Sequence, residues 1–391
     1  MEYRRFGKTE FRMPVLSCGA MRFQQSFKDD EPVTHESQAN VEACVKRALD
    51  AGIYHIETAR GYGTSEYQLG KILPQLPRDE ILVQTKVAPD MDVDKFVATF
   101  EKSMGLLNLD HIDLFSFHGI NSPGELDAAM ACLDTAQSWK HFGRIRDIGF
   151  STHGDPAIVQ RAIETDAFDH VNLHWYYIYQ EHWENIQAAR RRDMGVFIIS
   201  PNDKGGMLYK PSDKLRTLCD PLDPMVFNGL FCLSHPEVHT LSCGVAKPEE
   251  FDIHLDMVDM LHEAKEHIVP IEARLRAAMV EAFGETWVDT WAEGLPPVAD
   301  TPGEINVEWI LRLRNLAVAF DMIEYAKMRY NLLGNGGNWF PGYKADKMDE
   351  VGEEALVQAL SKSPHAEKIP GYLRKAHDLL AGEAVKRQSE S

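Results

Sequence analysis

Residues 1–255 alternate between short apolar runs and amphipathic stretches of helix length. The apolar runs are rich in β-branched and aromatic residues, which is typical of strands, and turn residues and helix-capping side chains follow them. Parallel strands need long crossover connections, so repeated strand–helix units of this spacing predict a parallel sheet. The predicted strands are Ile53–Thr58, Ile81–Val87, Ile112–His118, Ile145–Ser151, His170–Leu173, Val196–Ser200 and Thr240–Cys243.

The number of strands favours a closed (β/α)8 TIM barrel within an α/β fold class. Seven runs are recognisable and an eighth is expected, because periodicity misses short strands. An open Rossmann sheet is disfavoured because no Gly-x-Gly-x-x-Gly motif follows any strand. Ahead of the barrel, Tyr3–Phe6 and Met13–Cys18 flank a short turn. They predict an N-terminal hairpin that plugs one end of the barrel.

Beyond residue 255 the pattern predicts helices only. A long helix is expected over Asp256–Phe283, broken at Pro270, and a second over Ile305–Leu333, where apolar residues recur at helical spacing. The glycines at 334–337 should end the second helix, and Arg387–Ser391 should fray. The predicted domains are therefore a barrel at 1–255 and a helical C-terminal extension at 256–391.

Charge and targeting signals exclude several classes of partner. The chain has 41 Lys and Arg against 60 Asp and Glu, a net charge of −19, which argues against nucleic acid and anionic lipid as partners. It has neither a secretory h-region near Met1 nor a run of 18 apolar residues. Its six cysteines are scattered, without a Cys-x-x-Cys pair. A cytoplasmic location with reduced thiols and no membrane association is expected.

Four polar side chains stand at or just after three successive strand ends, where barrels carry their chemistry. Glu57 ends one strand and Tyr62 follows in the next turn, while Lys86 and His118 end the two strands after it. A lysine beside a tyrosine favours the phenolate and should lower the pKa of Tyr62, and the carboxylate can hold the lysine in place. The imidazole can orient a carbonyl oxygen. Together these residues predict a proton-transfer site.

The motifs around these residues resemble those of the aldo-keto reductases, in order and at the family's spacing. The resemblance implies a barrel that binds NADP(H) and reduces an aldehyde or ketone, a small-molecule carbonyl substrate. By the same resemblance Tyr62 is the general acid, Lys86 and Glu57 tune it, and His118 orients the carbonyl. The matching stretches are Ile56–Glu66, Gln84–Val87, Asp113–His118, Ile148–Ser151 and Ser200–Leu208.

The resemblance also implies cofactor-binding positions, with some departures from the family's pattern. Glu57 stands where the family has Asp, Ile199 where an aromatic residue commonly stacks on the nicotinamide, and Ala246 where a polar contact is usual. Lys247 is the candidate partner for a 2′-phosphate. The implied cofactor-binding residues are Ser151, Thr152, Asn172, Ser200, Pro201, Asn202, Lys204, Gly205, Gly206, Lys247 and Glu250.

The C-terminal extension resembles the ferredoxin-like helical domain of iron–sulfur aldo-keto reductase homologues, without its cysteines. No cysteine follows Cys243, and cluster iron needs Cys thiolates, so neither an iron–sulfur cluster nor another metal is expected. This unit could bind a protein partner or restrict access to the barrel.

Two alternatives to carbonyl reduction stay open at this point. The first is a low-turnover NADP(H)-sensing or protein-interaction subunit built on the same barrel. The second is an electron-transfer subunit that uses a partner's cluster. The substrate, its physiological direction, the preference for NADPH over NADH and the oligomeric state are left open.

Overall fold

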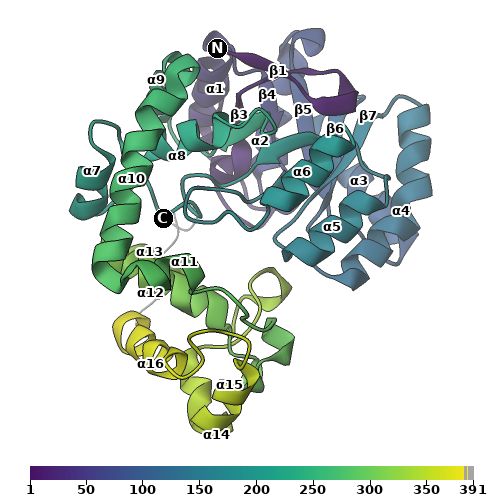
Figure 1. Ribbon diagram of the computed structural model, residues 1–391. Coiled ribbons are helices and arrows are strands. Elements are labelled where there is room, and N and C mark those ends of the chain that lie inside the picture. The colour runs from purple at the N-terminus through teal and green to yellow at the C-terminus, as the bar shows by residue number, and fades with distance from the viewer. Residues whose placement is uncertain (383–384, 386–391) are drawn as a thin grey trace. The chain divides into compact units, whose positions relative to one another are not determined.

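The structure, a computed structural model, describes residues 1–382 and 385 (Figure 1). Arg387–Ser391, predicted to fray, lie outside the described residues. The chain divides into two compact units, one formed by Met1–Gly205 with Asn228–Ala264 and the other by Gly206–Phe227 with the chain from Lys265 onward. The domain boundary expected at residue 255 stays a prediction. No helix in the described part of the chain has the length and apolar character needed to cross a membrane.

The first unit is built on a closed barrel of eight parallel strands, which confirms the predicted fold. The strands are joined in the order β10-β3-β4-β5-β6-β7-β8-β9. An antiparallel hairpin of β1 (Tyr3–Arg5) and β2 (Arg12–Pro14) precedes them. The barrel strands are β3 (Leu16–Gly19), β4 (His55–Glu57), β5 (Leu82–Val87), β6 (Ile112–His118), β7 (Ile145–Ser151), β8 (His170–Leu173), β9 (Gly195–Ile198) and β10 (Thr240–Cys243).

The eighth strand lies where the sequence predicted the second arm of the hairpin. The run Met13–Cys18 is divided, because Pro14 ends β2 and Leu16 begins β3. All four residues of β3 are buried, and it pairs with β10 on one side and β4 on the other. Only Val15 separates the two strands, so they read as one apolar run, which is why sequence patterning assigned β3 to the hairpin.

The hairpin plugs the end of the barrel at which the strands begin, as predicted. Phe6, Phe11 and Met13 form one buried cluster with Leu82, Leu114 and Phe197 of the strands. The turn between the arms needs Gly7, whose φ is +57° and where a Cβ would lie 2.4 Å from the Asp193 carbonyl oxygen. The opposite end, where the strands terminate, is thereby left for the functional side chains.

A helix follows each strand of the barrel, and in four of these helices a side chain caps the first turn. Side-chain oxygens of Thr34, Asp92, Ser122 and Asp155 each accept a backbone N–H of the first helical turn. Such a cap typically contributes about 1 kcal/mol. The helices that follow strands β3–β10 are α1 (His35–Asp50), α2 (Ser65–Leu69), α3 (Val93–Leu107), α4 (Pro123–His141), α5 (Pro156–Glu164), α6 (Trp183–Arg191), α8 (Pro224–Leu233) and α9 (Asp252–Asp259).

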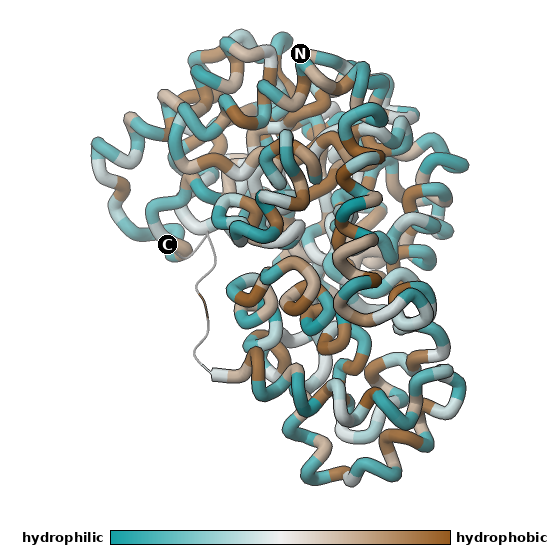
Figure 2. The backbone as a smooth tube through the Cα atoms, turned by 60° about the vertical axis from the view of Figure 1, so that its left-hand side comes forward, coloured by the Kyte–Doolittle hydropathy of each residue, from teal (hydrophilic) through white to brown (hydrophobic). Residues whose placement is uncertain are grey.

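The second unit is helical, and its helices carry apolar and hydrophilic residues in alternation along the tube (Figure 2). It includes α7, which comes from the stretch after β9, and there Arg274 Nε donates to the Leu218 carbonyl over 2.9 Å. Its helices are α7 (Asp213–Cys219), α10 (Ala264–Phe283), α11 (Glu285–Thr290), α12 (Val307–Phe320), α13 (Ile323–Tyr330), α14 (Met348–Val351), α15 (Glu353–Ala359) and α16 (Ile369–Leu380).

Both predicted long helices of this region differ from the structure. Helix α10 continues through Pro270, since a proline removes one ladder hydrogen bond and leaves the others, and the break lies instead at 260–263. The stretch Ile305–Leu333 forms two helices because Asp321 adopts a left-handed conformation, φ +56°, and its N–H caps the Leu316 carbonyl. Helix α13 ends at Tyr330, shortly before Gly334 (φ +85°).

Candidate active site

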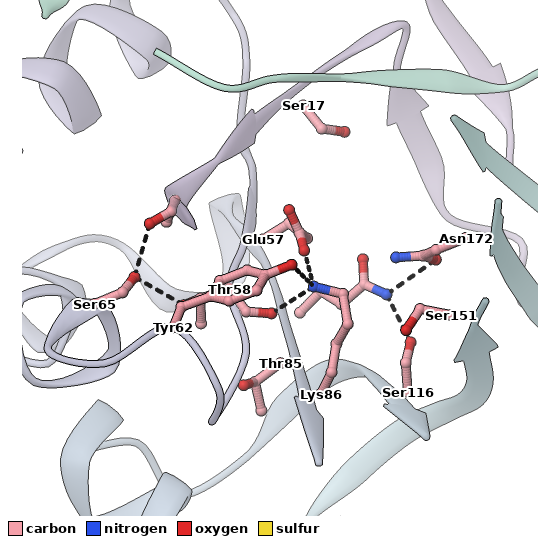
Figure 3. A network of polar contacts seen from close by, with 12 residues as sticks. Ser17, Glu57, Thr58, Tyr62, Ser65, Thr85, Lys86, Ser116, Ser151 and Asn172 are labelled. Atoms are coloured by element: carbon pink, nitrogen blue, oxygen red, sulfur yellow. Dashed lines mark hydrogen bonds and ion pairs between the residues drawn. The ribbon is translucent and has the colours of Figure 1, made fainter. Parts of the chain in front are cut away.

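Lys86 is the centre of a buried polar cluster at the ends of β4 and β5 (Figure 3). Its Nζ donates to the Thr58 carbonyl over 2.8 Å and to the Tyr62 hydroxyl over 3.3 Å, and it contacts Glu57 Oε1. Burial lowers the pKa of Lys86, while these oxygens stabilise its charged form. The lysine is thus fixed between a carboxylate and a phenol.

Glu57 reaches Lys86 although it is longer than the aspartate of the family's pattern. Gly19, the last residue of β3, lies beside this carboxylate and closer still to Ser242. A Cβ at Gly19 would lie 2.3 Å from Ser242 Oγ and 3.5 Å from Glu57 Oε2. The close approach of Ser242 therefore favours glycine at this position, while Glu57 lies at an ordinary contact distance.

His118 completes the predicted set of four, and the structure brings all four together. Its ring meets the Tyr62 ring edge to face, with centroids 5.7 Å apart and planes at 87°. Burial, with a smaller effect from the Lys86 charge, lowers the pKa of His118 to about 3. The imidazole is therefore neutral at pH 7 and presents one N–H donor and one acceptor.

The predicted direction of the pKa shift of Tyr62 is wrong. A lowered pKa was predicted from the neighbouring lysine, but burial raises the pKa of Tyr62. The reason is desolvation, which disfavours the phenolate, and sequence patterning does not reveal it. Tyr62 therefore holds its proton at neutral pH, as a proton donor must.

A second buried network, which the sequence analysis missed, supports the loop that carries Tyr62. Glu66 Oε1 accepts from Thr85 Oγ1 over 2.7 Å and Oε2 accepts from Ser103 Oγ over 3.2 Å. Arg60 contacts Glu66 with one guanidinium nitrogen and donates to Asp29 Oδ2 over 2.5 Å with another. The residues on both sides of Tyr62 are thereby tied to β5, to α3 and to the segment before α1.

We expect Arg60→Leu to lower kcat by up to about 10²-fold, because a displacement of a catalytic group by about 1 Å has that effect. Cofactor affinity should stay within twofold of wild type, since Arg60 acts through the Tyr62 loop. Arg60→Lys should recover part of kcat. The control is Arg47→Leu, which removes a surface ion pair with Asp252. Steady-state kinetics with separate kcat and KM are the measurement, and an unchanged kcat for Arg60→Leu would contradict this assignment.

Two histidines lie fully buried inside the barrel. His55 Nδ1 is 2.6 Å from Ser17 Oγ, and His170 Nε2 is 2.9 Å from Ser116 Oγ. The remaining ring nitrogen of each has no hydrogen-bond partner among the described residues. Burial lowers the pKa of both His55 and His170 to about 3, so both are neutral near pH 7.

Ser151 and Asn172 stand side by side, one at the end of β7 and the other within β8. Asn172 is fully buried, its Oδ1 accepts from Gln84 Nε2 over 3.3 Å, and its Nδ2 has no partner among the described residues. An unsatisfied buried donor beside a serine hydroxyl fits a carboxamide ligand such as that of nicotinamide. The neighbouring Thr152 fits less well, since its hydroxyl donates to the Ile120 carbonyl and accepts from the Gly154 N–H.

The predicted cofactor-binding residues after β9 lie in a tightly folded loop. Ser200 has φ +52°, and a Cβ at Gly205 would lie 2.0 Å from the Pro201 carbonyl oxygen. Asn202 Nδ2 is 3.2 Å from His254 Nε2. Lys204 Nζ is 2.9 Å from His153 Nδ1 and 3.3 Å from His174 Nε2. Gly206 is the first residue of the other unit.

Lys247 and Glu250, the cofactor-binding residues predicted after β10, differ in their contacts. Glu250 Oε2 accepts from Arg22 over 2.6 Å and from the Ala246 N–H over 2.9 Å. Lys247 is exposed at the start of a short 3-10 helix, Pro248–Phe251. Arg22 was missed, because it lies 228 residues from Glu250 and no local spacing connects them.

Trp287 takes part in aromatic and polar contacts within the C-terminal unit. Trp287 Nε1 donates to Asn315 Oδ1 over 3.1 Å, and its ring lies 4.8 Å from that of His365. Within residues 1–382 and 385, no group of three His, Cys, Asp or Glu side chains is arranged to hold a metal ion. The ferredoxin-like resemblance of this unit stays a prediction.

Comparison with known proteins places the barrel among characterised relatives. A model of the aldo/keto reductase family matches residues 15–266. The chain is 29% identical over 182 residues to the L-glyceraldehyde 3-phosphate reductase of Escherichia coli K12, a match that covers 42% of this chain and 49% of that one. It is 36% identical over 110 residues to the 9,11-endoperoxide prostaglandin H2 reductase of Trypanosoma cruzi, covering 27% and 34%. The matches thus span about half of these relatives or less.

Solved structures show the same fold. An aldo-keto reductase from Bacillus halodurans, in its holo form, superposes with a TM-score of 0.59 at 19% identity. The superposition covers 69% of this chain and 96% of that one. At this identity the likeness is one of fold, and it supports the (β/α)8 barrel.

Proposed function

The chain belongs to the aldo/keto reductase family, and on that basis we propose that it reduces an aldehyde or ketone with NADPH. The observation that carries the proposal is the position of Lys86, whose Nζ touches both the Glu57 carboxylate and the Tyr62 hydroxyl. Such an arrangement supports proton donation by Tyr62 to a carbonyl oxygen.

The residues fit a nicotinamide cofactor at its carboxamide end. When bound, the reduced nicotinamide supplies a hydride to the carbonyl carbon. Ser151 and the unsatisfied Nδ2 of Asn172 would hold the carboxamide, and the folded loop at 200–205 would contact the phosphates. The exposed Lys247 would meet a 2′-phosphate and favour NADPH over NADH.

Tyr62 and His118 act on the carbonyl oxygen. Both would donate hydrogen bonds to it, and the proton of Tyr62 would pass to the oxygen as negative charge develops there. Lys86, 3.3 Å from the phenol oxygen, stabilises the phenolate that is left behind. Burial raises the pKa of Tyr62, so the phenolate needs the lysine charge to form. The phenolate develops only as the proton leaves, so Lys86 stabilises the transition state more than the ground state.

The alternative of a low-turnover NADP(H)-sensing subunit has two observations in its favour. The Thr152 hydroxyl is engaged within its own loop, and Ile199 packs against the hydrophobic cluster of the hairpin. Both positions would then give the cofactor fewer contacts than the family's pattern implies.

Purified protein should oxidise NADPH only when a carbonyl compound is present. We would measure absorbance at 340 nm with a panel of aldehydes and ketones, starting from phosphorylated aldehydes because the relative from Escherichia coli is named for one. Cofactor binding is followed in parallel by quenching of the fluorescence of the seven Trp residues, with NADPH and NADH. NADPH binding without turnover on any carbonyl would favour the sensing alternative, and absence of binding would refute both.

A further inference from the structure

Gln84 is a fully buried side chain of the barrel interior to which the proposed reaction gives no role. It stands on β5, two residues before Lys86. Its Nε2 donates to Ser116 Oγ over 2.8 Å and to Asn172 Oδ1 over 3.3 Å, and both partners are labelled in Figure 3. Asn172 belongs to β8, which is not a neighbour of β5 in the barrel. One amide thus connects the strand that carries the lysine with the predicted carboxamide site.

The surroundings of Gln84 orient its amide. A carboxamide nitrogen only donates, and it carries two N–H groups. Ser116 Oγ lies 2.9 Å from His170 Nε2, and this imidazole is neutral near pH 7 because burial lowers its pKa to about 3. With its proton on Nδ1, the ring accepts from the Ser116 hydroxyl, whose oxygen accepts from Gln84. Gln84 Nε2 also lies 3.2 Å from the same ring nitrogen. Each of these contacts then pairs a donor with an acceptor, and the second N–H of Gln84 is directed at Asn172.

The same donor decides which end of the Asn172 amide faces the cofactor side. The terminal torsion of an asparagine is roughly two-fold, so the side chain alone favours neither orientation strongly. Only Oδ1 can accept from Gln84, and this contact leaves Nδ2 buried and without a partner among the described residues. Ser151, paired with Asn172 in strand register, supplies a hydroxyl beside it. Without the Gln84 donor the Asn172 amide could rotate and present its oxygen instead.

We propose that Gln84 is a positioning residue that holds the Asn172 amide with Nδ2 directed at the carbonyl oxygen of the nicotinamide carboxamide. The inference rests on the proposed function, because the carboxamide belongs to the proposed cofactor. Gln84 would act through Asn172 and would not touch the cofactor itself. The site would therefore select for a carbonyl acceptor on the pyridine ring, and the ring substituent would not need an amide nitrogen to satisfy Asn172.

The test is a double-mutant cycle on the dissociation constant for NADP⁺, measured with the full chain by quenching of tryptophan fluorescence. Gln84→Met keeps the length of the side chain and removes its amide. We expect it to weaken binding about fivefold to tenfold, the factor that one neutral hydrogen bond supplies. In an Asn172→Ala background the same substitution should change the dissociation constant by less than about twofold, because the two residues act as one unit.

The matched control is Thr240→Val, which removes another buried hydroxyl of the barrel interior. Thr240 Oγ1 is bonded to Ser17 Oγ over 2.7 Å and makes no contact with Gln84 or Asn172 among the described hydrogen bonds. This variant should bind NADP⁺ like the wild type. Far-ultraviolet circular dichroism and urea unfolding of each variant verify its fold.

A cofactor analogue distinguishes orientation of Asn172 from a general loss of packing. The 3-acetylpyridine analogue of NADP⁺ carries a carbonyl acceptor but no amide nitrogen. Nicotinamide can adapt to a rotated Asn172 by rotating its own carboxamide, whereas the acetyl group offers no donor. Gln84→Met should therefore weaken binding of the analogue at least about threefold more than binding of NADP⁺.

The proposal is overturned if Gln84→Met binds both cofactors like the wild type, if its loss is equal for the two cofactors, or if the loss persists in full in the Asn172→Ala background. Absence of cofactor binding by the wild type would refute the proposed function and this inference together. Cofactor binding with the expected coupling, but without carbonyl-dependent turnover, would refute the proposed reduction and leave the role of Gln84 standing.

Discussion

Tyr62→Phe is expected to lower kcat for carbonyl reduction about 10²- to 10⁴-fold, the range typical for loss of a general acid. The substitution removes only the hydroxyl that lies 3.3 Å from Lys86 Nζ and keeps the ring that packs edge to face on His118. The dissociation constant for NADPH should therefore stay within about twofold of the wild-type value. Single-turnover measurement of NADPH oxidation isolates the chemical step from product release.

The matched control for this experiment is Tyr67→Phe, which removes a hydroxyl from an exposed tyrosine of the adjoining helix α2. It should retain wild-type kcat. If Tyr62→Phe also kept most of its activity, another group would have to supply the proton, and the mechanism proposed for Tyr62 would be wrong. A variant that loses NADPH binding as well would indicate a damaged loop, which circular dichroism and the Arg60 variants would reveal.

The second large effect is a loss of folding stability as the pH falls. His55 and His170 have a pKa of about 3 in the folded protein and about 6.5 when unfolded. The unfolded chain therefore binds more protons between these values, and the stability that each histidine contributes above pH 6.5 is lost as the pH falls toward 3. Between pH 7.5 and 5.0 this loss is about 2 kcal/mol of unfolding free energy for each histidine.

Replacing these histidines by glutamine should make the free energy of unfolding depend less on pH below neutrality. We expect His55→Gln to lose about 2 kcal/mol less than the wild type between pH 7.5 and 5.0, and the double variant with His170→Gln about 4 kcal/mol less. Urea unfolding at the two pH values measures this difference. The exposed His262→Gln serves as the control and should follow the wild type. Parallel pH profiles for wild type and double variant would show that the two buried imidazoles do not drive acid unfolding.

The main elements of the site followed from the sequence because they obey a local rule. Glu57 and His118 end their strands, and Lys86 stands one residue before the end of β5. The strand ends of a parallel barrel lie at one face, so the meeting of these residues with Tyr62 could be predicted without coordinates. The same reasoning found seven of the eight barrel strands. It failed for β3, because only Val15 separates β3 from β2 and the two strands read as one run.

What the sequence did not reveal depends on residues far apart or on burial. Asp29 and Arg60 are 31 positions apart in the sequence, and Arg22 and Glu250 are 228 positions apart. Local sequence spacing therefore predicts neither contact. The sign of the Tyr62 pKa shift depends on desolvation, which only a folded arrangement defines. The helix break at Asp321 depends on one residue adopting a left-handed conformation that several residue types tolerate.

The pairing of β3 with β10 has a consequence for how the chain reaches its fold. Leu16 pairs with Leu241, so the first strand of the barrel finds its second neighbour only when the last strand is present. During synthesis from the N-terminus, β3 keeps one unpaired edge until nearly all of the barrel has been made. Contacts of such sequence separation slow folding, and open strand edges invite association between chains. Barrel closure is thus the step at which a nascent chain of this design is most exposed to misassembly.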